Sequence, residues 1–157
     1  MNITFDRRIE SCFSPQHLWN LVVDAFRDST GSPLWPNHLE SLRCEQLEPG
    51  ATIHATYHVG PFDLPQTYSV PTCNADSRTL TYRTGEDHPL DGGGELRVVP
   101  TERGSALVWS GSYEAESNFD AFGAALFVKT WFERRFFDAL ESNLRRLERL
   151  SPPDELR

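Results

Sequence analysis

The chain has 157 residues and carries a formal net charge of −8 at pH 7. This length suits one domain with one core, and we expect that domain to span residues 1–151, followed by a short disordered tail at 152–157. The acidic balance argues against nucleic-acid binding, because nucleic-acid-binding surfaces usually concentrate positive charge.

The cysteine pattern and the N-terminal sequence bear on the compartment. The chain has three cysteines, Cys12, Cys44 and Cys73, and no two of them form a CxxC motif. Three thiols cannot all pair within one chain, so reduced thiols are expected. The first ten residues lack the apolar core of a signal peptide, and no run approaches the roughly 18 apolar residues of a membrane span. We therefore expect a cytoplasmic protein without membrane insertion.

The first third of the chain predicts a strand followed by two short helices. Apolar and polar residues alternate over residues 3–10, as in a half-buried strand. Ser14 and Pro15 then supply an N-cap and a first-turn proline for a helix that the segment RDSTGS ends. The next segment, PLWPNHLES, has room for only one more short helix, because Pro36 interrupts it.

Strands dominate the middle of the chain. Alternation and turn residues predict strands at residues 42–47, 51–59, 66–70, 79–83, 95–99 and 105–115, the first of them the weakest. The run Gly92–Gly94 precedes one of these strands, and we interpret it as plain loop or as a flexible hairpin or pocket lid.

One long helix is predicted over residues 118–150. Ser117 and Asp120 form a capping-box pattern at its start, and Ser151 with two following prolines ends it. Its second half is amphipathic, whereas residues 121–128 carry no charge on any face and need cover on both sides. Strands followed by a helix indicate an α+β domain with an antiparallel sheet.

Four segments carry a resemblance to a known family: SPQHLWNLVVD, LWPNHLESLRCE, PTERGSALVWSGSYE and the long terminal helix. Together they resemble the START/Bet v 1-like (SRPBCC) superfamily, in its polyketide cyclase/dehydrase and lipid-transport-like branch, over nearly the whole chain. The resemblance implies a helix-grip fold: a curved antiparallel sheet of about six to seven strands wrapped around a long C-terminal helix, two short helices after the first strand, and a cavity between sheet and helix. This superfamily hosts many functions on one frame and has no single catalytic signature, so the catalytic residues stay unknown.

The inward-facing strand positions are rich in aromatic residues with polar tips. Their hydroxyl groups need partners, which a ligand, ordered water or one another could supply. Burial of Glu133 on the same helix stripe would raise its pKa and suit it to acid–base chemistry, although a bond to a tyrosine or water is an equal alternative. The predicted ligand-binding residues are Tyr57, Tyr68, Tyr82, Trp109, Tyr113, Phe122, Leu126, Thr130, Glu133 and Phe137.

Neither a metal nor another cofactor is expected. His54 and His58 share one face of a strand but lie roughly 13 Å apart, too far for one zinc ion, and that face is opposite the apolar one. Trp131 lies beside Phe127 on the back of the long helix, where a homodimer contact or cover by the segment around Trp35 would bury it. Helix phase drifts over such a length, so Trp131 could instead reach the edge of the pocket.

The sequence thus favours binding of a small hydrophobic or amphipathic molecule between sheet and helix. A cyclase- or aromatase-like enzyme acting in the same cavity is the first alternative, so whether the protein is an enzyme stays open. A co-chaperone-like interaction module that uses the outer face of the sheet is the second.

Overall fold

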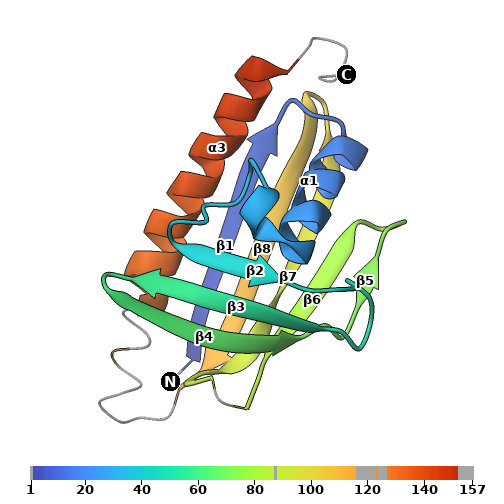
Figure 1. Cartoon of the computed structure of the whole chain (residues 1–157). Coiled ribbons are helices and arrows are strands. Elements are labelled where there is room, and N and C mark those ends of the chain that lie inside the picture. The colour runs from blue at the N-terminus through green and yellow to red at the C-terminus, as the bar shows by residue number, and fades with distance from the viewer. Residues whose placement is uncertain (1, 87, 116–122, 124–126, 152–157) are drawn as a thin grey trace.

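The structure is a computed structural model that describes residues 2–86, 88–115, 123 and 127–151 (Figure 1). The predicted tail at 152–157 and most of the predicted first half of the long helix lie outside the described residues. The strands are β1 (Asn2–Ser11), β2 (Glu40–Arg43), β3 (Thr52–Val59), β4 (Phe62–Ser69), β5 (Cys73–Asn74), β6 (Thr79–Thr84), β7 (Asp91–Thr101) and β8 (Gly104–Glu114). The helical elements are α1 (Pro15–Arg27), the 3₁₀ turn η1 (Ser29–Gly31), the π-helical segment η2 (Phe127–Phe136) and α3 (Phe137–Leu150).

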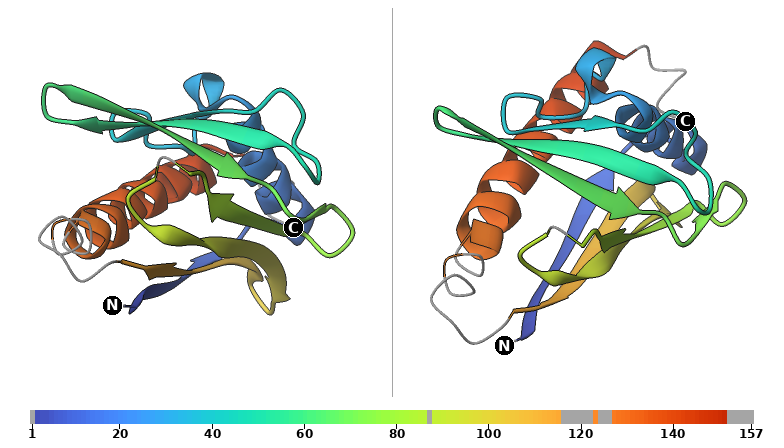
Figure 2. Two further views of the ribbon diagram at one scale, coloured as in Figure 1. Left: turned by 90° about the horizontal axis from the view of Figure 1, so that it is seen from below. Right: turned by 60° about the horizontal axis from the view of Figure 1, so that its bottom comes forward.

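The described strands form one antiparallel sheet in the order β1-β8-β7-β6-β4-β3-β2, with the short β5 paired to β6. Because the sheet is strongly curled, its β2–β3–β4 part and its β1–β8–β7 part lie on opposite sides of α3 (Figure 2). The predicted α+β helix-grip architecture is therefore confirmed. Leu140 and Leu144 of α3 are fully buried in the core that this curl encloses.

Helix α1 begins as predicted, with the Ser14 hydroxyl accepting a hydrogen bond from the His17 amide at 3.2 Å. The second short helical element is only the three-residue turn η1, upstream of the segment in which a helix was expected. Residues 33–35 form a bend and residues 37–39 a turn, and the strand predicted at 42–47 instead runs from Glu40 to Arg43. This shift places the Glu40 side chain on the inner face of the sheet.

The glycine run is a strand, so the loop and lid interpretations were wrong. Gly92 to Gly94 lie inside β7 and pair with β8, while Gly93 and Gly94 also pair with β6. A Cβ atom on Gly93 would overlap the carbonyl oxygen of Tyr82, and one on Gly94 would overlap the Tyr82 hydroxyl. Glycine is required here because neighbouring strands and a tyrosine ring approach the backbone closely.

The start of the C-terminal helix is wound differently from the prediction. Segment η2 is a π-helix, which has more residues per turn than the 3.6 of an α-helix. Trp131, Phe132, Phe136 and Phe137 are consequently all buried, although an α-helical phase would spread them around the axis. The same change of phase leaves Glu133 partly exposed.

Candidate ligand-binding cavity

A cavity of about 340 Å³ lies between the concave face of the sheet, the end of α1 and segment η2. Its walls are mostly aromatic and aliphatic side chains. Leu64 and Pro89, which are exposed, and His88, which is half-buried, mark its opening to solvent. The lining residues are Phe26, Trp35, Glu40, Leu42, Ile53, Tyr57, Leu64, Gln66, Tyr68, Tyr82, His88, Pro89, Leu90, Trp109, Tyr113 and Phe132.

The strand register explains how the polar residues of the lining come together. Glu40 of β2 lies opposite Tyr57 of β3, which in turn lies opposite Leu64 of β4. Gln66 follows on the same face of β4, as a diagonal neighbour of Tyr57. One cross-strand patch therefore presents a carboxyl, a phenol and an amide to the cavity.

Three buried polar atoms that belong to lining residues have no hydrogen-bond partner among the described residues: Glu40 Oε2, Gln66 Oε1 and Trp35 Nε1. Buried polar atoms are normally paired, and an unpaired one costs about 1–3 kcal/mol. An unpaired carboxyl oxygen, amide oxygen and indole N–H around one cavity indicate a place for a polar group that the protein itself does not supply.

Glu40 is the ionisable group with the strongest effect on this site. Its side chain is 4% exposed, and burial raises the pKa of its carboxyl from an ordinary 4.5 to about 8. No cation among the described residues is paired with it. At neutral pH the Glu40 carboxyl of the empty cavity is therefore mainly protonated.

Four tyrosine hydroxyls of the lining form two hydrogen-bonded pairs. The Tyr57 and Tyr68 hydroxyls share a short hydrogen bond. Trp109 Nε1 donates to the Tyr82 hydroxyl at 3.0 Å, and the Tyr82 and Tyr113 hydroxyls lie 3.1 Å apart. Burial is the largest cause of a raised pKa at all four, to about 12 for Tyr82, and the nearby Glu40 carboxylate raises the pKa of each further. These phenols therefore stay protonated and act as hydrogen-bonding groups at neutral pH.

His88 extends the first tyrosine pair toward the opening. The Leu90 amide donates to His88 Nδ1 at 3.0 Å, so the proton of the neutral ring lies on Nε2, which donates to the Tyr68 hydroxyl at 3.2 Å. Burial lowers the pKa of His88 and keeps its ring neutral. The cavity thus has no charged basic group among its described lining residues.

The structure brings half of the predicted ligand-binding residues together. Tyr57, Tyr68, Tyr82, Trp109 and Tyr113 all line the cavity. From the predicted helix set, Phe137 is fully buried against Trp109 but is not part of the lining, and Thr130 is exposed. Glu133 borders a separate, shallower hollow beside β7 and β8, while Phe122 and Leu126 lie outside the described residues.

Trp131 is not on an exposed back of the helix. It is 7% exposed and packs edge-on against Tyr57, with ring centroids 5.5 Å apart. The alternative that Trp131 reaches the edge of the pocket matches this contact. The exposure that motivated a homodimer through Phe127 and Trp131 is therefore absent at Trp131, and the dimer stays a prediction.

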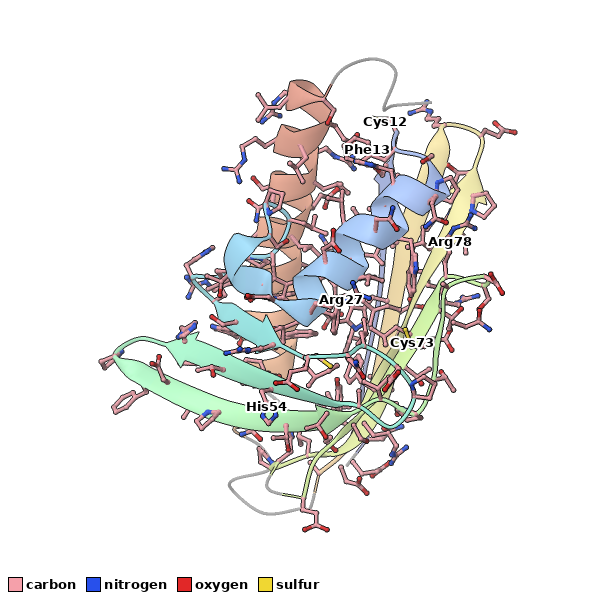
Figure 3. The ribbon with its side chains drawn as sticks, turned by 45° about the vertical axis from the view of Figure 1, so that its right-hand side comes forward. Cys12, Phe13, Arg27, His54, Cys73 and Arg78 are labelled. Atoms are coloured by element: carbon pink, nitrogen blue, oxygen red, sulfur yellow. The ribbon has the colours of Figure 1, made fainter. Side chains whose placement is uncertain are left out.

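The histidines of the outer sheet face and the three thiols are the other candidates for a metal or reactive site. His54 is exposed on β3 (Figure 3), while His58 bonds Ser41 and Asp63. Among the described residues, no three His, Cys, Asp or Glu side chains lie close enough together to hold a metal ion. The three thiols are unpaired with one another, and Cys12 donates to Glu148 at 2.7 Å. No helix in the described part of the chain is long and apolar enough to cross a membrane.

Sequence reasoning missed Glu40, Gln66 and His88 as site residues. Glu40 has the same strand parity as Leu42 and Cys44, which are both buried. Extending the alternation by two residues toward the N-terminus would have placed Glu40 on the inner face. Gln66 shares the strand parity of Tyr68 and Val70, both buried, but a single amide on an inner face does not by itself indicate a ligand site. His88 follows from no local pattern, because the loop that holds it is positioned by contacts distant in sequence.

Fold and cavity together define a helix-grip protein with an aromatic interior cavity. The chain belongs to the polyketide cyclase/dehydrase and lipid transport family, whose model matches residues 2–151. No curated protein matches the chain by sequence.

Solved structures show the same fold at low sequence identity. The Zhui aromatase/cyclase from Streptomyces sp. R1128 is 14% identical with a TM-score of 0.68, covering 96% of each chain. Norcoclaurine synthase from Thalictrum flavum, in complex with dopamine and hydroxybenzaldehyde, is 17% identical with a TM-score of 0.67, covering 97% of this chain and 90% of that one. Ara h 8.0201 is 16% identical with a TM-score of 0.65, covering 93% of this chain and 99% of that one.

Proposed function

We propose that this protein binds one small, largely apolar molecule in the cavity between the sheet and η2. The observation that carries the proposal is the cavity itself: about 340 Å³ of space with aromatic walls and three unpartnered polar atoms. Ligand sites characteristically combine apolar walls with a few polar groups that fix orientation. The norcoclaurine synthase structure, which holds two small aromatic molecules in the same fold, supports this reading.

A cavity-filling substitution tests the proposal. Ile53 is buried on the inner face of β3, and His54 is exposed on the opposite face of the same strand. Ile53→Trp should fill much of the cavity and abolish binding, whereas His54→Trp adds the same side chain outside it and should bind as the wild type does. Native mass spectrometry of protein purified without organic solvent, followed by denaturing extraction, would identify a co-purified molecule and measure its occupancy in each variant.

The comparison contains its own checks. Circular dichroism melting of both variants establishes that each is folded, and Ile53→Phe serves as a smaller filling residue if the tryptophan overpacks the core. Equal occupancy in Ile53→Trp and the wild type would contradict the proposal. So would a wild-type protein that is empty and also binds no hydrophobic dye, which would favour the interaction-module alternative.

Acid–base catalysis on the bound molecule is a second candidate function, favoured by the Glu40 carboxyl. A carboxyl with a pKa of about 8 among tyrosine hydroxyls is suited to proton transfer near neutral pH. In that case the molecule extracted from the protein would be a chemically altered form of the molecule supplied to it. Comparing Glu40→Gln with Glu133→Gln would then separate the carboxyl in the cavity from the one on the helix.

A further inference from the structure

The chemistry of the unpartnered atoms restricts the ligand more than the apolar walls do. Two of the three are oxygens, Glu40 Oε2 and Gln66 Oε1, and both belong to the β2–β3–β4 patch centred on Tyr57. Both act as hydrogen-bond acceptors when the Glu40 carboxyl is ionised. A group that satisfies both acceptors must donate at least two hydrogen bonds. Alcohols donate one, whereas a primary ammonium group donates three.

The charges around the patch also favour a cation. The groups that face Glu40 are Tyr57 on β3, Tyr68 on β4, Tyr82 on β6 and Tyr113 on β8, all neutral phenols, while His88 in the loop before β7 is held neutral by burial. Glu40 is therefore the described lining residue that can carry a formal charge near neutral pH, and that charge is negative.

Aromatic rings complete the environment that cations prefer. Rings of tyrosine and tryptophan attract a cation near their faces, most strongly when water is excluded. Here Trp35, Tyr57, Tyr68 and Trp109 line the same cavity as Glu40, and Trp131 packs behind Tyr57. A buried carboxyl within an aromatic enclosure resembles an ammonium site more than a site for a carboxylate or phosphate.

We propose that the ligand of this cavity carries a primary amine, bound as ammonium between Glu40 and Gln66, with an aromatic or aliphatic body against the apolar walls. This inference rests on the proposed function and names the polar end of its ligand. Binding then transfers the Glu40 proton to solvent, because the carboxyl must ionise to pair with the ammonium group. The amine keeps its own proton, so charge and protons balance.

Three probes with one ring system test the inference: 2-naphthylmethylamine, 2-naphthalenemethanol and 2-naphthoate. Isothermal titration calorimetry should show the amine binding about tenfold more tightly than the alcohol, and the carboxylate most weakly. Titration at pH 7 in two buffers of different ionisation enthalpy should show release of about one proton with the amine and none with the alcohol. Both readouts use the wild-type protein and need no substitution.

Two variants locate the effect. Glu40→Gln keeps the size of the side chain and removes its charge, and should weaken the amine about tenfold while changing alcohol affinity by less than about twofold. Glu45→Gln removes one negative charge from an exposed residue just beyond β2 and should change neither affinity. This control separates direct pairing from the overall net charge.

The outcomes distinguish the two proposals. If the amine and the alcohol bind equally, or if Glu40→Gln keeps the preference for the amine, the amine inference is overturned and the cavity proposal stands. Tightest binding by the carboxylate would overturn the inference as well. If none of the three probes binds the wild type, both this inference and the proposed function are overturned.

Discussion

Glu40 should couple the stability of the fold to pH. Burial raises the pKa of its carboxyl from 4.5 to about 8, so the folded state holds a proton that the unfolded chain has released. Stability is lost as pH rises through this window, because ionisation is easier in the unfolded chain. Between pH 5 and pH 8 the free energy of unfolding should fall by roughly 3 kcal/mol because of this group. Each unit of pKa difference between the folded and unfolded states corresponds to about 1.4 kcal/mol.

Urea unfolding of the ligand-free protein between pH 5 and pH 8, compared with Glu40→Gln, measures this effect. In Glu40→Gln the free energy of unfolding should not show this fall toward pH 8. His88 acts in the opposite direction: burial lowers its pKa, so its contribution is lost as pH falls below its usual 6.5. Parallel stability curves for the wild type and Glu40→Gln would contradict the burial of the Glu40 carboxyl.

Individual residues of the site differ in how far sequence could reveal them. The inner-face tyrosines followed from strict alternation in strands that the turns delimit clearly. Glu40 did not, because a charged residue at the start of a weak strand is more usually a surface residue. Alternation with Leu42 gives its side of the strand, but its burial results from pairing with Tyr57 on β3 and from sharing one cavity with aromatic residues distant in sequence.

At the scale of elements, the glycine run of β7 shows how packing can override local propensity. Three consecutive glycines favour a loop, yet here they let β6, β7 and β8 approach closely where the sheet curls. The η2 segment is a comparable case: apolar periodicity predicts an α-helix, but the sheet contacts select a π-helical winding that buries Trp131 beside Phe132. The positions of both elements were predictable, and their internal geometry was not.

Gly93→Ala tests whether this close approach stabilises the sheet. The added Cβ would overlap the carbonyl oxygen of Tyr82 on the paired strand, so β6 and β7 would have to separate. We expect a loss of about 1–3 kcal/mol in the free energy of unfolding, measured with urea. Gly31→Ala is the matched control, since a Cβ there meets nothing within 4 Å and should change stability by less than about 0.5 kcal/mol. An equal effect at both positions would show that the conformational freedom of glycine, rather than strand contact, is what matters.

For the whole molecule, the architecture places the ligand between parts of the chain that are distant in sequence. The lining comes from α1, β2, β3, β4, β6, β8 and η2 and from the loops that hold Trp35 and residues 88–90, so a molecule in the cavity contacts both parts of the curled sheet and the helix. The later part of α3, including Leu144, packs in the core but does not line the cavity. Ligand binding should therefore slow local opening of the elements that line the cavity and leave local opening of the later part of α3 unchanged.

Hydrogen–deuterium exchange with and without saturating 2-naphthylmethylamine measures this distribution. Peptides from β2, β3, β4 and η2 should gain about tenfold or more in protection at 100 times the dissociation constant, because only the closed state binds. Peptides from residues 143–150 of α3 report the global stabilisation that any ligand of the folded state gives, so the local gain is the protection in excess of theirs, and Ile53→Trp should show no gain anywhere. Protection confined to the outer face of the sheet would place the bound molecule outside the cavity, since a ligand held between sheet and η2 slows the local opening of the elements that enclose it.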